Sequence, residues 1–110
     1  MGMTIAEKIL AAHGGADTAT PGQYMWCKVD ATSGHRLRDL EALGVDRVWD
    51  PARVFQVDDH QAPPPTVVAA NQVKNMRRLI KKYEITNFFE YGRGGILHQV
   101  FAENGMYAPG

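Results

Sequence analysis

The sequence alternates between short β-prone runs and helical stretches, and this alternation limits the fold more than any other feature of its 110 residues. Runs rich in aromatic and β-branched side chains predict strands at 24–29, 45–49, 54–57 and 85–89. Between them, apolar residues recur at helical spacing. Strands that alternate with helices of about ten residues or more are typical of a parallel sheet. The sequence therefore predicts an α/β fold in which helices flank a short parallel sheet.

Capping signals and apolar spacing together predict three helices. They cover 4–13, the stretch from Asp30 or Ser33 to Leu43, and 67–83. At the start of the first helix, Thr4 and Glu7 form a capping box, in which the hydroxyl and the carboxylate each accept a backbone N–H. Thr66 is the predicted cap of the longest helix, and glycines follow the first two.

The predicted sheet is small for a chain that folds by itself. Parallel strands are normally buried on both faces, yet the sequence offers only these few helices and short strands. We therefore expect residues 1–110 to form one partial domain of three layers that belongs to a larger sheet.

The balance of charge excludes a general nucleic-acid binder. Lys plus Arg and Asp plus Glu number 12 each, and the pI is about 6.9, whereas nucleic-acid-binding domains carry a basic surplus. The cluster Arg77, Arg78, Lys81 and Lys82 is interpreted as the solvated end of a helix. No apolar run approaches the roughly 20 residues that span a bilayer, and the start does not read as a signal peptide. We expect a cytoplasmic protein without membrane contacts.

Asp59 and His60 are the first candidates for chemistry. They follow an extended run, and ligands in open α/β sheets bind beyond the carboxyl ends of the strands. A carboxylate beside an imidazole orients the ring, fixes its tautomer and raises its pKa. The alternative is a solvated turn in which Asp58 and Asp59 cap the following loop.

His98 is the other candidate, because it follows the glycine-rich turn 91–95, where the backbone could approach a ligand closely. Its apolar neighbours in the segment 96–101 favour a buried core residue instead. The turn is not a dinucleotide-binding fingerprint, since no strand–turn–helix unit with a following acidic residue surrounds it.

The remaining candidates have simpler interpretations. His13 lies at a helix C-terminus, where positive charge is favourable, and His35 is expected on the surface. The single cysteine, Cys27, excludes an internal disulfide and a CxxC metal site, and is expected to be buried and inert. No metal- or cofactor-binding residue is predicted.

Several stretches, taken in order, resemble the 3-isopropylmalate dehydratase large subunits of the aconitase family. They are Met3–Leu10, Pro21–Asp30, Val57–His60, Gly95–Gln99, Glu103–Gly105 and Ala108–Gly110. Val57–His60 looks like the family's Asp-His motif, and Gly95–Gln99 resembles its Gly-Ile-X-His-Gln motif. The resemblance covers nearly the whole chain and implies the N-terminal portion of an aconitase-type domain.

The resemblance implies a hydro-lyase that removes and restores water on a 2-hydroxy di- or tricarboxylate, as in leucine biosynthesis. In the family a [4Fe–4S] cluster acts as the Lewis acid. By position, Asp59 and His60 would assist the leaving hydroxyl, and His98 would belong to the same site. The rest of the large subunit and a small subunit would be the partners.

Departures from the family pattern predict that the isolated chain is inactive. Such clusters are held by several cysteine thiolates, which Cys27 alone cannot supply. The family's serine base and most substrate-binding arginines lie outside this region. Where the family often places a glutamine or proline after Ser33, this chain has Gly34-His35, which puts one substrate contact in doubt. Two alternatives stay open: a stand-alone binding or assembly module derived from the fold, and a small metal enzyme using His60 and His98.

Overall fold

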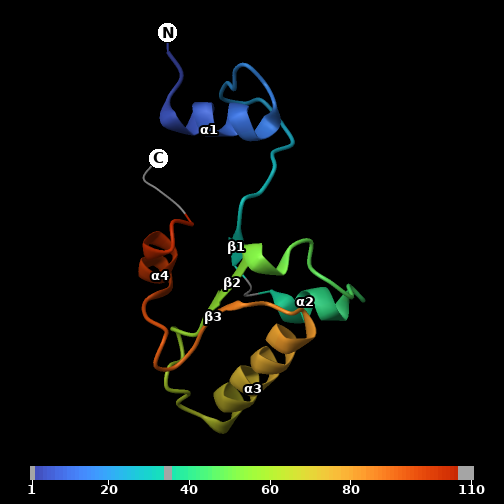
Figure 1. Ribbon diagram of the computed structural model, residues 1–110, viewed down its shortest axis with the longest axis vertical. Helices are drawn as coiled ribbons and strands as arrows, with labels where there is room; N and C mark the ends of the chain where they lie inside the picture. The colour runs from blue at the N-terminus through green and yellow to red at the C-terminus, as the bar shows by residue number, and fades with distance from the viewer. Residues whose placement is uncertain (1, 34–35, 107–110) are drawn as a thin grey trace. The chain divides into compact units, whose positions relative to one another are not determined.

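The computed structural model describes residues 2–33 and 36–106, so the predictions for Gly34-His35 and for Ala108–Gly110 lie outside the described residues. The chain forms two compact units, one built on the residues up to Asp30 and the other beginning at Ala31. Figure 1 shows the elements of both units.

The first unit contains helix α1 (Ile5–Gly14), as predicted. Both hydrogen bonds of the capping box form: Thr4 Oγ1 accepts from the Glu7 amide at 3.3 Å, and Glu7 Oε2 accepts from the Thr4 amide at 2.7 Å. Gly15 ends the helix in the left-handed region at φ 66°, where glycine has no side chain to clash. Local sequence signals therefore suffice to set both ends of this helix.

The strand predicted at 24–29 is wrong. This segment has no ladder partner among the described residues, and Tyr24 and Trp26 are almost fully exposed. Instead, the Lys28 amide donates to His13 O at 3.0 Å, and Cys27 is half-buried with Sγ 3.6 Å from Leu10 O. Aromatic residues favour an extended backbone, but a strand also requires another strand to pair with. In this unit the segment contacts helix α1 instead.

The second unit is a parallel sheet, which confirms the predicted α/β class. Its strands pair in the order β1-β2-β3, with Thr32 opposite Val54 and Val57 opposite Phe89. The strands and helices are β1 (Thr32–Ser33), α2 (Leu37–Ala42), the short 3-10 helix η1 (Pro51–Arg53), β2 (Val54–Val57), α3 (Val67–Lys82), β3 (Asn87–Phe89) and α4 (Leu97–Glu103).

Helices cover both faces of this sheet, so the unit has three layers (Figure 1). On one face, Val54 packs against residues of α2 and α3 that include Leu37 and Leu79. On the other face, Val57 packs with α4, as does Phe55, whose ring meets that of Phe101 edge-on. This division follows the strand period, since successive side chains of β2 point to opposite faces.

Three boundaries differ from the predictions. Helix α2 begins only at Leu37, because Ser33 is taken up by β1 and no side chain of the described residues caps the helix. Residues 45–49 form no strand; β1 and β3 already occupy both edges of β2. Strand β3 begins at Asn87, since the Ile85 amide donates to Ile80 O and so closes the end of α3.

Candidate functional site

The Asp59-His60 pair lies beyond the carboxyl end of β2, as the sequence predicted. The Asp58 amide donates to Phe89 O at 2.9 Å and so extends the pairing of β2 with β3 by one residue. The chain then leaves the sheet at Asp59. In parallel sheets this edge is where ligands bind, and the fold therefore presents the pair at the position that chemistry would use.

Asp59 connects the pair to a distant part of the chain. Its Oδ2 accepts the Leu97 amide at 2.8 Å, at the first residue of α4, while its Oδ1 contacts His60 Nδ1. The Asp59 side chain is 15% exposed, whereas that of His60 is 74% exposed. One carboxylate thus holds both the imidazole and the start of a helix that is 38 positions away in the sequence.

These contacts keep Asp59 ionised. Burial is the largest influence on the pKa of Asp59 and raises it, but the hydrogen bonds from the Leu97 amide and from His60, with the charge of His60, outweigh burial. The pKa of Asp59 therefore lies below its ordinary value. An ionised carboxylate at Nδ1 orients the ring and directs the other ring nitrogen, Nε2, away from Asp59. The pair can hold a proton and present it at Nε2.

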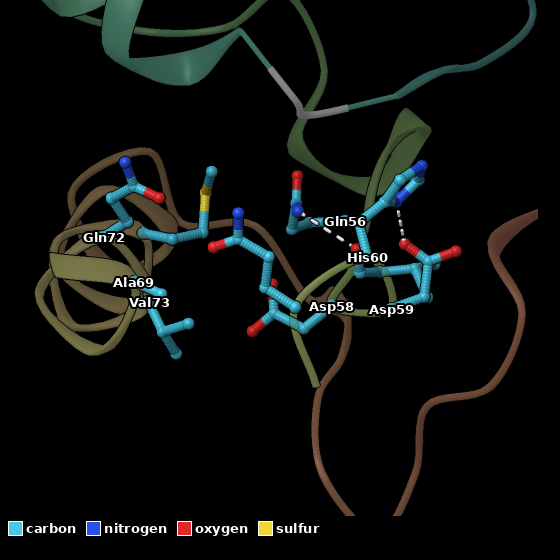
Figure 2. A pocket seen from close by; sticks show the side chains of 10 residues that line it. Gln56, Asp58, Asp59, His60, Ala69, Gln72 and Val73 are labelled. Carbon is cyan, nitrogen blue, oxygen red and sulfur yellow. Dashed lines mark hydrogen bonds and ion pairs between the residues drawn. The ribbon is translucent and has the colours of Figure 1, made fainter. Parts of the chain in front are cut away.

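Two open hollows flank the pair, one toward each neighbouring element. The first, about 270 Å³, lies between the end of β2 and helix α3. Figure 2 shows Gln56, Asp58, Asp59 and His60 across from Ala69, Gln72 and Val73 of α3. The second, about 390 Å³, is walled by Glu90 and the glycine-rich turn 91–95. Asp58, Asp59 and His60 line both hollows, so a ligand in either one would meet the pair.

His98 does not join Asp59 and His60 in lining these hollows. It lies on α4, one residue after the Leu97 amide that Asp59 binds, and its side chain is exposed. The interpretation of His98 as a buried core residue is wrong, because Leu97, Val100 and Phe101 form the buried face of the helix. The hydrogen bond from the Leu97 amide to Asp59 Oδ2 positions the start of its helix.

Sequence reasoning missed Glu90, Tyr91 and Gln72 as wall residues. Glu90 could have been found, because it follows β3 directly as Asp58 follows β2, and adjacent parallel strands end at one edge. Its carboxylate is engaged by Arg77 of α3, with Nε 2.6 Å from Oε2. Gln72 gave no signal, since a glutamine on an exposed helix face is ordinary.

The residues of this chain do not fit an iron–sulfur cluster. Among the described residues, no group of three or more His, Cys, Asp or Glu side chains is placed to hold a metal ion. The sequence has one cysteine, and its Sγ faces the Leu10 carbonyl in the first unit. Thiolates for a cluster would have to come from residues outside this sequence.

None of the helices in the described ranges is both long and apolar enough to cross a bilayer.

Comparison with known proteins assigns the chain to a family. No family model matches it. The 3-isopropylmalate dehydratase large subunits of Thermodesulfovibrio yellowstonii, Sulfurihydrogenibium sp. and Aquifex aeolicus are 44%, 40% and 40% identical to it, each over an alignment of 116 positions that includes the whole chain. The chain spans only 27–28% of the length of these relatives. Over its whole length, therefore, it belongs to the family of 3-isopropylmalate dehydratase large subunits and represents little more than a quarter of a member.

Proposed function

We propose that this chain supplies part of the active site of a hydro-lyase that removes and restores water on a 2-hydroxy di- or tricarboxylate. The observation that carries the proposal is the Asp59-His60 pair at the carboxyl end of β2, bordered by two hollows. The similarity to dehydratase large subunits supports the same reaction class.

In this proposal His60 is the residue that donates and accepts a proton, and Asp59 holds the imidazole of His60 in position. Dehydration breaks a C–O bond and a C–H bond on the neighbouring carbon. The C–H electron pair forms the C=C bond while a base from outside this chain takes that proton, and the hydroxyl leaves as water only if it gains a proton of its own. Protonated His60 donates that proton from Nε2, while Asp59 holds the ring at Nδ1 and stabilises its positive charge. In the reverse direction the neutral ring takes a proton from water. General acid–base assistance of this kind contributes about 10²–10⁴-fold to a rate.

His98 is proposed to act in the same site from the start of α4. The bond between Asp59 Oδ2 and the Leu97 amide fixes that helix beside the pair. The side chain of His98 is exposed, so a substrate carboxylate could reach its ring. A change of rotamer about the side chain suffices to redirect an exposed ring.

The remaining parts of the enzyme belong to the proposal as well. A [4Fe–4S] cluster would supply the Lewis acid, held by thiolates from the remainder of a large subunit. The expected partner is a small subunit, and no binding to nucleic acid or to a membrane is expected. The expected location is the cytoplasm. The isolated chain lacks these parts and is proposed to be inactive.

The test is made on the native polypeptide that carries this sequence. We expect its mass to be several times that of 110 residues, its iron content to be stoichiometric and its dehydratase activity to be measurable with 2- or 3-isopropylmalate. A native polypeptide of this length with no dehydratase activity in the presence of any partner subunit would contradict the proposal. A stand-alone binding or assembly module would then be the better interpretation.

A further inference from the structure

In the first unit, His13 makes two hydrogen-bond contacts whose partners are both acceptors. His13 lies in the last turn of α1, where Nδ1 is 2.8 Å from the Ile9 carbonyl oxygen and Nε2 is 2.6 Å from Asp30 Oδ2. The His13 side chain is 29% exposed and that of Asp30 is 72% exposed. Asp30 is 17 positions further along, the last residue before the second unit.

This arrangement fixes the protonation state of the ring. A neutral imidazole carries one N–H, and a backbone carbonyl and an ionised carboxylate accept hydrogen bonds without donating any. Both contacts can be hydrogen bonds to such acceptors at once only if the ring carries a proton on each nitrogen. The C-terminus of α1 adds a favourable environment for the positive charge.

The other charged and titratable side chains described in this unit are few. They are Glu7, Lys8, Asp17, Tyr24, Cys27 and Lys28. Glu7 is engaged at the opposite end of α1 by the Thr4 amide. The pKa of His13 is raised above 6.5, chiefly by the hydrogen bond with Asp30 and then by the hydrogen bond with the Ile9 carbonyl and the charge of Asp30. Burial lowers this pKa by a smaller amount.

The pair closes the segment 16–30 onto α1. The same closure is held by the bond between the Lys28 amide and His13 O, by Cys27 Sγ near Leu10 O, and by Met25, which packs where a side chain on Gly14 would stand. Ala11 and Ala19 are the buried apolar residues described in this unit. Apolar burial in this unit is small, so polar contacts, the His13–Asp30 pair among them, contribute to the closure.

We propose that His13 and Asp30 form a proton-dependent clip that fastens residues 16–30 to α1 and releases them as the pH rises. Because the bound form has the raised pKa, the contribution of the clip is fully present below the ordinary histidine value of 6.5 and is lost as pH rises through the raised value. The clip lies outside the Asp59-His60 site and does not depend on the proposed dehydratase function.

The test uses the 110-residue chain and two readouts that follow the clip separately from global folding. An NMR titration of the His13 ring should show a pKa above 6.5, which Asp30→Asn lowers. The second readout is hydrogen exchange of the Lys28 amide, which donates to His13 O. As the pH rises, its exchange rate should increase more than the intrinsic pH dependence of amide exchange explains. The additional increase should be about tenfold for each pH unit by which the His13 pKa is raised.

Controls separate the clip from a general effect of charge or of unfolding. Asp17→Asn removes an exposed acid from the same unit and should leave both readouts as in the original chain, while His13→Asn should abolish the extra pH dependence. Exchange at Val57, in β2 of the second unit, should follow only its intrinsic pH dependence in all variants. A His13 pKa at or below 6.5, or a loss of protection as large in Asp17→Asn as in Asp30→Asn, would overturn the proposal.

Discussion

At the scale of single residues, Asp59 organises the candidate site. Its two carboxylate oxygens reach different parts of the chain, the imidazole of His60 and the amide that begins α4. The sequence predicted the pair, because the two residues are adjacent and follow an extended run. The contact with Leu97 was not predictable, since nothing local indicates which of many distant amides a carboxylate will meet.

Replacing Asp59 by asparagine should destabilise the second unit and remove part of its acid sensitivity. A charge-assisted hydrogen bond contributes about 1.5–3 kcal/mol, and asparagine keeps the shape but loses the charge. Because the pKa of Asp59 is lowered from 3.8, its contribution is present above pH 3.8 and is lost as pH falls below that value. Urea unfolding of the original chain and of Asp59→Asn should differ at pH 7, and the difference should shrink as the pH falls below 3.8; a difference that stays the same below pH 3.8 would contradict this role.

At the scale of elements, local signals predicted the helices better than the strands. Thr4 and Thr66 mark helix starts that form as predicted, each with its capping hydrogen bond. The run 24–29 has the composition of a strand but no strand to pair with in the described part of its unit. A helix satisfies its own backbone, whereas a strand depends on a partner that local sequence does not name.

The contact between α2 and α3 includes an ion pair beside its apolar packing, and this ion pair should respond to acid. Glu41 of α2 accepts hydrogen bonds from Arg78, with Nη1 to Oε1 at 2.9 Å, and from Lys82, with Nζ to Oε1 at 3.0 Å. The bonds from Arg78 and then Lys82 lower the pKa of Glu41 to about 2. The contribution of Glu41 is therefore present above its ordinary value of 4.5 and is lost as pH falls toward about 2.

We expect Glu41→Gln to flatten the pH dependence of stability between pH 4.5 and about 2. The measurement is the thermal midpoint of the second unit across that range. Glu103→Gln is the matched control, because Glu103 is an exposed acid that accepts a hydrogen bond from the neutral side chain of Gln99. An equally steep acid transition in Glu41→Gln and in the original chain would show that this ion pair does not stabilise the α2–α3 contact.

At the scale of the whole molecule, both the small predicted sheet and the resemblance indicated that the chain represents part of a larger protein. The pattern of strands and helices predicted a parallel sheet, and the structure has one. Both of its main apolar clusters belong to the second unit. The amino-acid composition did not indicate the division into two units, because that division depends on which segments contact each other in the folded chain.

The two units should differ in their response to a core substitution. Leu79 is fully buried in the second unit, and Leu79→Ala should cost about 2–5 kcal/mol there through lost burial and the resulting cavity. The chain has two tryptophans, Trp26 in the first unit and Trp49 in the second. With Trp26→Phe or Trp49→Phe as background, fluorescence during urea unfolding follows one unit at a time. We expect Leu79→Ala to shift the Trp49 transition only; equal shifts of both would show a single cooperative unit.

The central claim is that the Asp59-His60 pair works on substrate, and the turnover number of a complete dehydratase carrying His60→Asn tests it most directly. Asparagine removes the titratable ring, and we predict that kcat falls about 10²–10⁴-fold while the iron content and fold are retained. His13→Asn, in the first unit, is the control and should keep kcat within a few-fold. A complete enzyme with His60→Asn that turns over substrate at the original rate would contradict the account.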